Sequence, residues 1–380
     1  MNLKLKKTVK LVYSNLEPYD FWSIGEKLKN KFYKYNISNL GENEILESCP
    51  PYRSNIIFKN KKPFIGLVKS ESHQYSYWPK FERYLIENKI PYEFFEVKKS
   101  DFIEQAKKYD IIIWRTLSLY SEQWEAKEKV EFMEKFLFKK ILPSAESIWF
   151  YEDKIRQAWL FKNNNLPFIN TFVSHDKNEA LDYIDRATYP LISKDKTSSS
   201  ANGVRLLKNK RESRKHIMDI FSKGLSLPES YVKQKNYVIF QEKVPNEGFD
   251  LRVIIIGNYY LGYYRYPKKG DFRASGSGVY EKKSIPKEVL LLAKKIKESL
   301  PHTDMLAVDF LQDSRDMNYY IIETSIFIAV ESSEQLYDNG ISGRYVEKNG
   351  EFEFEKGRFW IQEMMVDQVI RDWIKEEELK

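Results

Sequence analysis

Short apolar segments alternate with segments of helical periodicity between residues 63 and 114, and this alternation limits the folds open to the chain. The apolar runs 63–68, 92–97 and 110–114 have the length of buried strands. Residues 79–88 and 102–108, between them, carry apolar side chains at helical spacing. The order strand–helix–strand–helix–strand predicts a parallel α/β domain.

The second half of the chain follows a different pattern. Residues 251–261 hold two apolar runs around Gly257-Asn258, a strong signal for a tight hairpin, and 305–311 with 319–325 suggest a second hairpin. We therefore expect mainly antiparallel sheet in this half. Further expected elements are a helix at 151–164, strands at 190–194 and 237–241, and a helix at 21–35.

Composition places the chain among soluble globular proteins of two or three domains, with 380 residues, 42% hydrophobic and 31% charged. Cys49 is the only cysteine, so no disulfide can form within the chain, and we expect a cytoplasmic protein. The basic start is not followed by an apolar run, and residues 253–264 are too short to span a bilayer. We expect neither a secretory signal nor a membrane span.

The net charge of +7 raises the question of a polyanionic partner. Lysines and glutamates interleave, as in residues 127–131 and 375–378, and no long block of one sign occurs. We interpret this charge as solvated surface and expect no nucleic-acid partner.

Two carboxylates stand inside apolar strands. Asp309 lies within Leu306–Leu311, and Glu323 ends the run that begins at Tyr319. A buried carboxylate is costly unless it is paired, and two on neighbouring strands suggest a shared cation such as Mg²⁺. Two separate salt bridges are the alternative.

Cations and small residues form a second group. Lys194 ends an apolar strand and precedes residues 195–204, a loop of small polar side chains whose backbone could approach phosphate closely. A plain surface turn is the alternative. Residues 69–73 and 115–118 follow the first and third strands of the parallel domain, where they could bind an anion or simply cap helices.

Arginines form the third group. Asp250 and Arg252 share one face of a strand, since side chains alternate along it. Arg265 follows the second strand of the hairpin, and Arg273 lies in a Gly-Ser segment. A guanidinium can hold phosphate or carboxylate through two hydrogen bonds, although a surface salt bridge is the alternative for each arginine.

The order of these segments resembles the ATP-grasp superfamily, especially its glutathione synthetase and ribosomal-protein glutamate ligase branch. The matching segments are 151–154, 189–204, 240–244, 250–253, 270–273, 307–309 and 322–325. The resemblance implies the α/β ATP-grasp fold behind an N-terminal parallel α/β domain. It divides the chain into a substrate-side domain (1–145), a lid subdomain (146–236) and a catalytic subdomain (237–380).

The resemblance also implies roles for individual residues. Arg252 and Arg273 correspond to residues that face the acyl phosphate and the acceptor. Asp309 and Glu323 correspond to magnesium carboxylates, with Ser325 where the family usually has asparagine, which puts a second metal position in question. The implied ATP contacts are Lys154, Lys194, Ser199, Gly203, Gln241, Glu242, Lys243, Val244 and Asp250.

The implied function is an ATP- and Mg²⁺-dependent carboxylate–amine ligase. It would join small-molecule or peptide carboxylates and amines through an acyl phosphate, and assembly into a homo-oligomer is left open. A small-molecule kinase on the same fold is one alternative. A non-catalytic nucleotide- or nucleic-acid-binding protein is the other.

Overall fold

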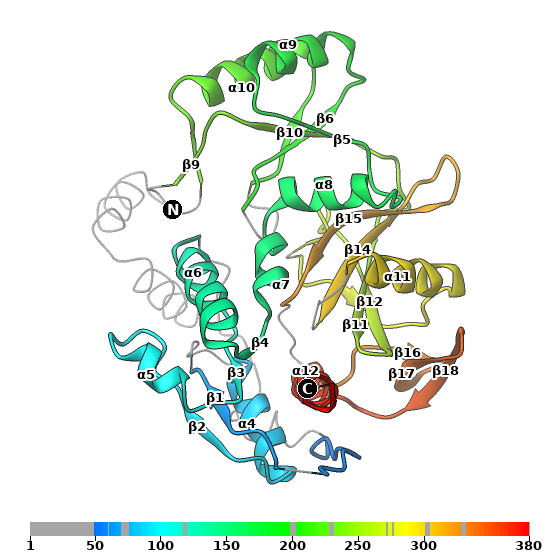
Figure 1. The fold of residues 1–380 in the computed structure, drawn as a ribbon. Helices are drawn as coiled ribbons and strands as arrows, with labels where there is room; N and C mark the ends of the chain where they lie inside the picture. The colour runs from blue at the N-terminus through cyan, green and yellow to red at the C-terminus, as the bar shows by residue number, and fades with distance from the viewer. Residues whose placement is uncertain are drawn as a thin grey trace, which may run out of the picture.

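The computed structural model describes residues 49–59, 61–69, 76–116, 120–197, 203–227, 232–270, 273–275, 277–300, 305–327 and 332–379. The helix expected at 21–35 lies outside these residues. Three bodies are visible, a small sheet domain, a lid, and a large sheet that lies between them on one side (Figure 1). Among the described residues, no helix is both long and apolar enough to cross a membrane.

The N-terminal domain is built on a parallel sheet of strand order β2-β1-β3-β4, as its sequence pattern predicts. Gly66 is required in the middle strand, because a Cβ there would lie 2.5 Å from the ring of Tyr109. The elements of this domain are β1 (Ile65–Leu67), α4 (Trp78–Glu87), β2 (Tyr92–Phe94), α5 (Phe102–Ala106), β3 (Ile111–Ile113), α6 (Tyr120–Leu137) and β4 (Lys140–Leu142).

Two short helices lead from this domain to the lid. They are α7 (Ala145–Phe150) and α8 (Lys154–Asn163). Ser144 caps α7 and Asp153 caps α8, each by accepting a hydrogen bond from a backbone N–H of the first turn. The cap at Asp153 places Lys154 at the first helical position of α8, which packs against β15 of the large sheet.

The lid is an antiparallel sheet of order β5-β10-β6-β7, with α9 and α10 together on one side of it (Figure 1). β10 pairs with both β5 and β6, and the boundary expected at residue 236 falls just before it. The elements are β5 (Thr171–Ser174), α9 (Lys177–Arg186), β6 (Leu191–Lys194), β7 (Arg205–Leu207), α10 (Lys210–Phe221), β8 (Leu225–Ser226), β9 (Lys233–Gln234) and β10 (Val238–Glu242).

The large sheet is antiparallel, in the order β15-β14-β11-β12-β17-β16, as its hairpin signals predict. The Gly257-Asn258 turn joins β11 to β12, and Gly257 adopts a positive φ of 55°. The elements are β11 (Asp250–Ile256), β12 (Tyr259–Arg265), β13 (Tyr280–Glu281), α11 (Lys287–Ser299), β14 (Leu306–Gln312), β15 (Tyr319–Ser325), β16 (Tyr337–Asp338), β17 (Ile341–Lys348), β18 (Glu351–Lys356) and α12 (Ile361–Glu378).

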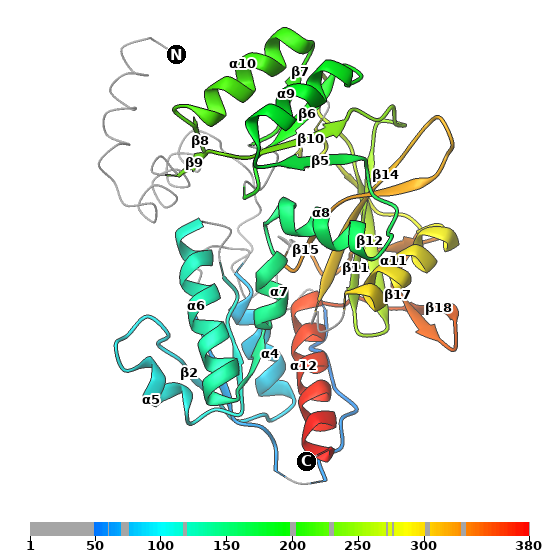
Figure 2. The same cartoon turned by 45° about the horizontal axis from the view of Figure 1, so that its top comes forward.

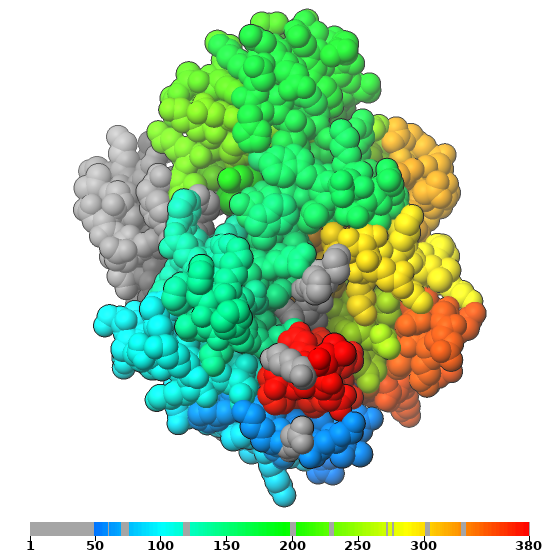
Figure 3. Space-filling view, in the orientation of Figure 1, coloured from blue at the N-terminus to red at the C-terminus, as the bar shows by residue number. Residues whose placement is uncertain are grey.

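Helix α12, near the C-terminus, packs beside α4 of the N-terminal domain and also contacts β11 of the large sheet (Figure 2). Arg83 donates to both carboxylate oxygens of Glu363, at 2.6 and 2.9 Å, and the Tyr84 hydroxyl donates to Asp367 at 2.7 Å. Both carboxylates are buried. This contact holds the N-terminal domain against the large sheet, and the surface of the molecule shows α12 seated between them (Figure 3).

Candidate active site

A row of charged side chains crosses three neighbouring strands of the large sheet. Arg252 of β11 is the register partner of Asp309 of β14, and Asp309 is the register partner of Glu323 of β15. Directly opposed residues of antiparallel strands project from the same face of the sheet. The two carboxylates that the sequence places in apolar strands are therefore neighbours.

Asp309 is held by two arginines. Arg252 donates to its two oxygens at 2.6 Å each, and Arg265 donates to Oδ2 at 2.7 Å. Arg265 also donates to Asp250 at 2.5 Å. Asp250 and Arg252, which are expected to share a strand face, are therefore connected through Arg265 and Asp309 in one network. Burial alone would raise the pKa of the Asp309 carboxyl, but the two guanidinium groups outweigh it and hold that pKa well below its usual range.

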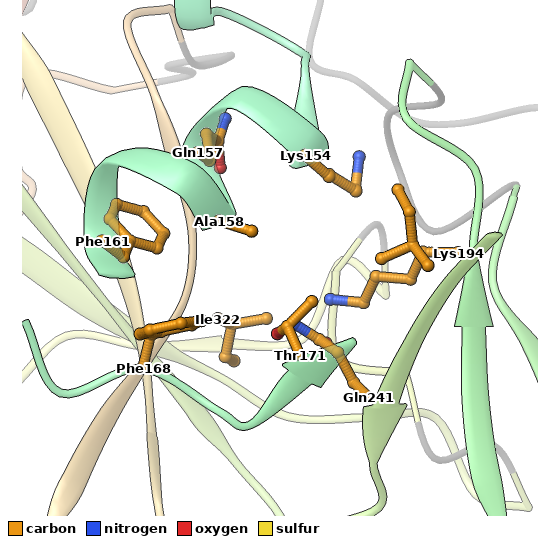
Figure 4. Close-up of a pocket in the computed structure, with 10 residues that line it drawn as sticks. Lys154, Gln157, Ala158, Phe161, Phe168, Thr171, Lys194, Gln241 and Ile322 are labelled. Atoms are coloured by element: carbon orange, nitrogen blue, oxygen red, sulfur yellow. The ribbon is translucent and has the colours of Figure 1, made fainter. Parts of the chain in front are cut away.

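Two lysines from different elements face this row. Lys154 begins α8 and Lys194 ends β6, and their side chains reach into the same space beneath the lid from different sides (Figure 4). The Lys154 ammonium lies 3.8 Å from Glu323. Burial lowers the pKa of Lys194 to about 8, whereas at Lys154 the carboxylates of Glu323, Glu152, Asp195 and Asp153 outweigh burial and raise its pKa.

A pocket continues from the lysines between α8, the lid strands and β15 (Figure 4). About 290 Å³ in and around it, part of it open to solvent, is not filled by atoms, and the room for the centre of a water molecule is only about 10 Å³. The Gln241 side chain donates to the hydroxyl of its strand partner Thr171 at 2.8 Å. Cations stand at one end and apolar side chains at the other, which suits a molecule with a charged end and a flat apolar end. Its lining residues are Lys154, Gln157, Ala158, Phe161, Phe168, Thr171, Lys194, Ile239, Gln241 and Ile322.

Gln157, which the sequence reasoning did not single out, fastens α8 to the strand that carries Glu323. Its side-chain amide donates to the carbonyl of Thr324 at 2.9 Å and accepts from the Thr324 N–H at 3.0 Å. The side chain is buried, so both bonds are shielded from water. A polar glutamine among the buried residues of the predicted helix 151–164 is the sequence signal that could have indicated this role of Gln157.

Glu152 is a second functional candidate that the sequence reasoning did not assign. It has a left-handed backbone conformation with φ of 49°, which is uncommon for a residue other than glycine or asparagine. Burial raises the pKa of its carboxyl to about 7, with Lys154, Arg252 and Arg115 opposing that rise and Glu323 adding to it. Its position directly before Asp153-Lys154, in a segment already identified, was the available signal.

The remaining predicted residues are spread around the pocket. Ser325 lies two positions beyond Glu323, on the same face of β15, opposite Ala307. Glu242 accepts a hydrogen bond from Arg315 at 2.6 Å, Lys243 is exposed and Val244 is buried. These three residues continue directly from Gln241, at the end of the strand that lines the pocket.

Three predicted residues belong to loops. Gly203 is half-buried just before β7, and Ser199 lies outside the described residues. Arg273 is exposed in the loop between β12 and β13. Contact of Arg273 with a reacting group therefore stays a prediction.

Glu323, in register with Asp309, suits a divalent cation that is completed by phosphate oxygens. Within the described ranges, no group of three or more histidine, cysteine, aspartate or glutamate side chains is arranged to hold a metal ion by itself. Mg²⁺, however, typically takes only one or two protein carboxylates together with nucleotide phosphates and water. Glu323, with its side chain 26% exposed, fits that donor set, whereas both oxygens of its register partner Asp309 already accept hydrogen bonds from Arg252 and Arg265.

Comparison with known proteins identifies the family. A model of the RimK-like ATP-grasp domain matches residues 151–347, which is more than half of the chain. The chain belongs to the RimK-like ATP-grasp family. The match spans Lys154, Lys194 and the row from Arg252 to Glu323, and the sequence prediction of an ATP-grasp fold is confirmed.

Three known proteins are similar to the chain. The α-aminoadipate–LysW ligase LysX of Saccharolobus solfataricus is 26% identical over 206 residues, 53% of this chain and 70% of LysX. The D-alanine–D-alanine ligase of Bacillus anthracis, solved with ATP, covers 83% of this chain and 99% of its own at 16% identity, with a TM-score of 0.55. The biotin carboxylase domain of the Hydrogenobacter thermophilus 2-oxoglutarate carboxylase, solved with MgADP, covers 82% of this chain and 70% of its own at 14% identity, with a TM-score of 0.56.

The two structural likenesses establish the shared fold, and the family match carries the class of enzyme. The expectation of an ATP-dependent carboxylate–amine ligase is confirmed at the level of that class.

Proposed function

We propose that this ATP-grasp protein binds MgATP between its lid and its large sheet, and that it forms an amide from a carboxylate and an amine through an acyl phosphate. The observation that carries the proposal is the placement of Lys154 and Lys194 opposite the Asp309–Glu323 row, at the charged end of a pocket whose other end is apolar. That geometry suits a nucleotide with its base under the lid and its phosphates beside the carboxylates.

Different residues would bind the phosphates, the base and the metal ion. Lys154 and Lys194 neutralise phosphate oxygens from the lid side, and Gln241 to Val244 line the edge where the base would lie. Asp309, Glu323 and Ser325 would hold Mg²⁺, which supplies charge neutralisation at the phosphates when bound. Arg252 is fixed by its two hydrogen bonds to Asp309, so it is oriented before any substrate arrives.

Catalysis of this kind comes from positioning and charge. The γ-phosphoryl group passes to the carboxylate oxygen, which forms a C–O–P linkage and releases ADP. The amine nitrogen then bonds to the carbonyl carbon, and phosphate leaves. The lid excludes water during both steps, which prevents hydrolysis of the acyl phosphate.

The test is a screen for ADP release with pooled acids and amines, followed by mass spectrometry of the active pool. A new amide together with free phosphate is the expected result. A phosphorylated product without free phosphate would instead identify a kinase. ATP binding without turnover in any pool would point to a non-catalytic nucleotide-binding protein.

A further inference from the structure

A second hollow lies at the edge of the large sheet opposite to β15, between the β16–β17 hairpin and the connection from β18 to α12 (Figure 1). In this C-terminal groove, which is open to solvent, about 430 Å³ can hold the centre of a water molecule, whereas the pocket beneath the lid offers about 10 Å³. A space of several hundred Å³ is the size of a small-molecule site. Among its lining residues are Glu334, Tyr337, Ile341, Ser342, Lys356 and Arg358.

The charges that line the C-terminal groove do not balance. Arg358 donates through Nε to the Glu334 carboxylate at 2.8 Å, and the Tyr337 hydroxyl donates to the same carboxylate at 2.5 Å. The Lys356 side chain, in contrast, forms no hydrogen bond or ion pair with any residue that the structure describes. Glu334 therefore has its partners within the protein, whereas Lys356 offers an ammonium group to an anion that enters the groove.

The β17 side of the groove offers an apolar surface and a hydroxyl. The Ile341 side chain is 44% exposed there, a large fraction for an isoleucine. The neighbouring Ser342 Oγ is buried and has no hydrogen-bond partner among the described residues. An unpaired buried hydroxyl costs free energy, and a change of the serine χ1 rotamer could bring it to a ligand atom. The groove therefore suits a molecule with an anionic group and an apolar part.

One wall of the groove is connected to the candidate active site. Residues 332–336 follow β15 in the chain and contribute Glu334 to this wall. The Ser332 hydroxyl donates to the Glu334 carbonyl at 3.0 Å and accepts from the Lys282 ammonium at 2.8 Å. Lys282 directly follows β13, at the end of the loop that carries Arg273. A ligand that displaces this wall would therefore act on both β15 and the β12–β13 loop.

We propose that the C-terminal groove binds a small effector molecule with a carboxylate or phosphate group, and that its occupancy changes the affinity of the active site for MgATP. The anion lies at Lys356 and the apolar part of the molecule lies against Ile341. This inference goes beyond the ligase function, because the effector is not a substrate. The residues from Lys356 to Arg358 lie beyond the segment 151–347 that matches the family model, so the family match does not account for the groove.

The probes are phenyl phosphate, benzoate and benzyl alcohol, titrated into the full-length protein while Mg²⁺ and a non-hydrolysable ATP analogue fill the ATP site. Phenyl phosphate and benzoate distinguish the two kinds of anion, and benzyl alcohol carries the ring without a charge. At least one anionic probe should bind with a Kd of about 1 mM or below, the range expected for a ligand of this size. Benzyl alcohol should bind at least about tenfold more weakly, because it lacks the charge-assisted contact with the ammonium.

Lys356→Gln should weaken the anionic probe by about tenfold and leave benzyl alcohol unchanged, because only the anion uses the ammonium. The matched control is Lys348→Gln, which removes an exposed lysine of β17 that pairs with Glu353, and it should change probe binding by about twofold or less. A saturating anionic probe should change the Kd of the ATP analogue by about fivefold in the unaltered protein. Lys356→Gln should remove that change and leave the affinity for the analogue alone unaltered.

The proposal is overturned if neither anionic probe binds, if benzyl alcohol binds equally well, or if Lys356→Gln leaves the binding of the anionic probe unchanged. Equal losses in Lys356→Gln and Lys348→Gln would also contradict it, since they would show an effect of surface charge in general. An anionic probe that binds at Lys356 without changing the Kd of the ATP analogue would refute the effector role. None of these measurements requires turnover, so they stand apart from the ADP-release screen that tests the ligase function.

Discussion

Asp309 and Glu323 are register partners, but their surroundings differ. Asp309 is buried and accepts three hydrogen bonds from two arginines, whereas Glu323 is partly open to solvent and has Lys154 3.8 Å away. Replacing Asp309 would leave buried guanidinium groups without their partner and so confuse stability with activity. Glu323 is the cleaner position for testing the metal site.

Glu323→Gln should lower kcat for ATP turnover by about 10²–10³, in the range of a lost electrostatic stabiliser. The thermal unfolding temperature should fall by a few degrees at most, because the ion pair with Lys154 is long, at 3.8 Å, and the Glu323 side chain is partly open to solvent. Steady-state kinetics and a melting curve measure both effects. Glu281→Gln, at an exposed carboxylate paired with Lys283, is the control, and a Glu323→Gln enzyme as active as this control would refute the assignment.

Lys194 has a pH dependence that follows from its burial. Its pKa of about 8 lies below the ordinary value because burial favours the neutral amine, so the ammonium is lost as pH rises through 8. Bound phosphate requires the ammonium. ATP affinity should therefore fall about tenfold between pH 7 and pH 9, since each pH unit above the pKa removes tenfold of the charged form.

Lys194→Arg supplies the comparison, since arginine stays charged throughout this range. Its ATP dissociation constant, measured by calorimetry at several pH values, should vary far less between pH 7 and pH 9. The same pH slope in both proteins would show that another group is responsible.

At the scale of elements, the sequence predicts the strands and helices that matter because their signals are local. The Gly257-Asn258 turn determines the β11–β12 hairpin, and the apolar run ending in Lys194 marks β6. The contacts of Gln157 were out of reach, because Thr324 is 167 residues away and only tertiary packing brings the two together. Glu152 was missed for the same reason, since its environment is assembled from three different parts of the fold.

The Gln157 side chain fixes the position of β15 relative to α8 through its two hydrogen bonds to the Thr324 backbone. Gln157→Leu should lower the free energy of unfolding by about 2–3 kcal/mol, because the N–H and C=O of Thr324 would both lose their buried partner. It should also raise the Mg²⁺ concentration required for turnover, since Glu323 and Ser325 flank Thr324. Urea unfolding and a Mg²⁺ titration test the two effects.

The control is Gln105→Leu. The Gln105 side chain forms exposed hydrogen bonds with the Glu96 N–H and the Asp101 carboxylate, both nearby in the sequence, so its loss should cost about 0.5 kcal/mol or less. If both variants lost the same free energy of unfolding, the proposed role of Gln157 in fastening α8 to β15 would be wrong.

At the scale of the whole molecule, the contact between α12 and α4 sets the position of the N-terminal domain. Glu363→Ala removes the carboxylate that pairs with the partly buried Arg83 guanidinium, so it should lower the free energy of unfolding by about 3 kcal/mol. Glu376→Ala, which removes an exposed partner of Lys140, should cost about 1 kcal/mol or less. Urea midpoints compare the two variants, and similar small losses would show that the contact does not hold the domains together.

The central claim is that a carboxylate is activated as an acyl phosphate, and an oxygen label follows it directly. The acid substrate is labelled with ¹⁸O at both carboxylate oxygens, turned over with ATP and the amine, and the released phosphate is analysed by mass spectrometry. One labelled oxygen in each phosphate is the predicted result, because the C–O bond of the acyl phosphate breaks when the amine attacks. Unlabelled phosphate alongside amide formation would contradict the account.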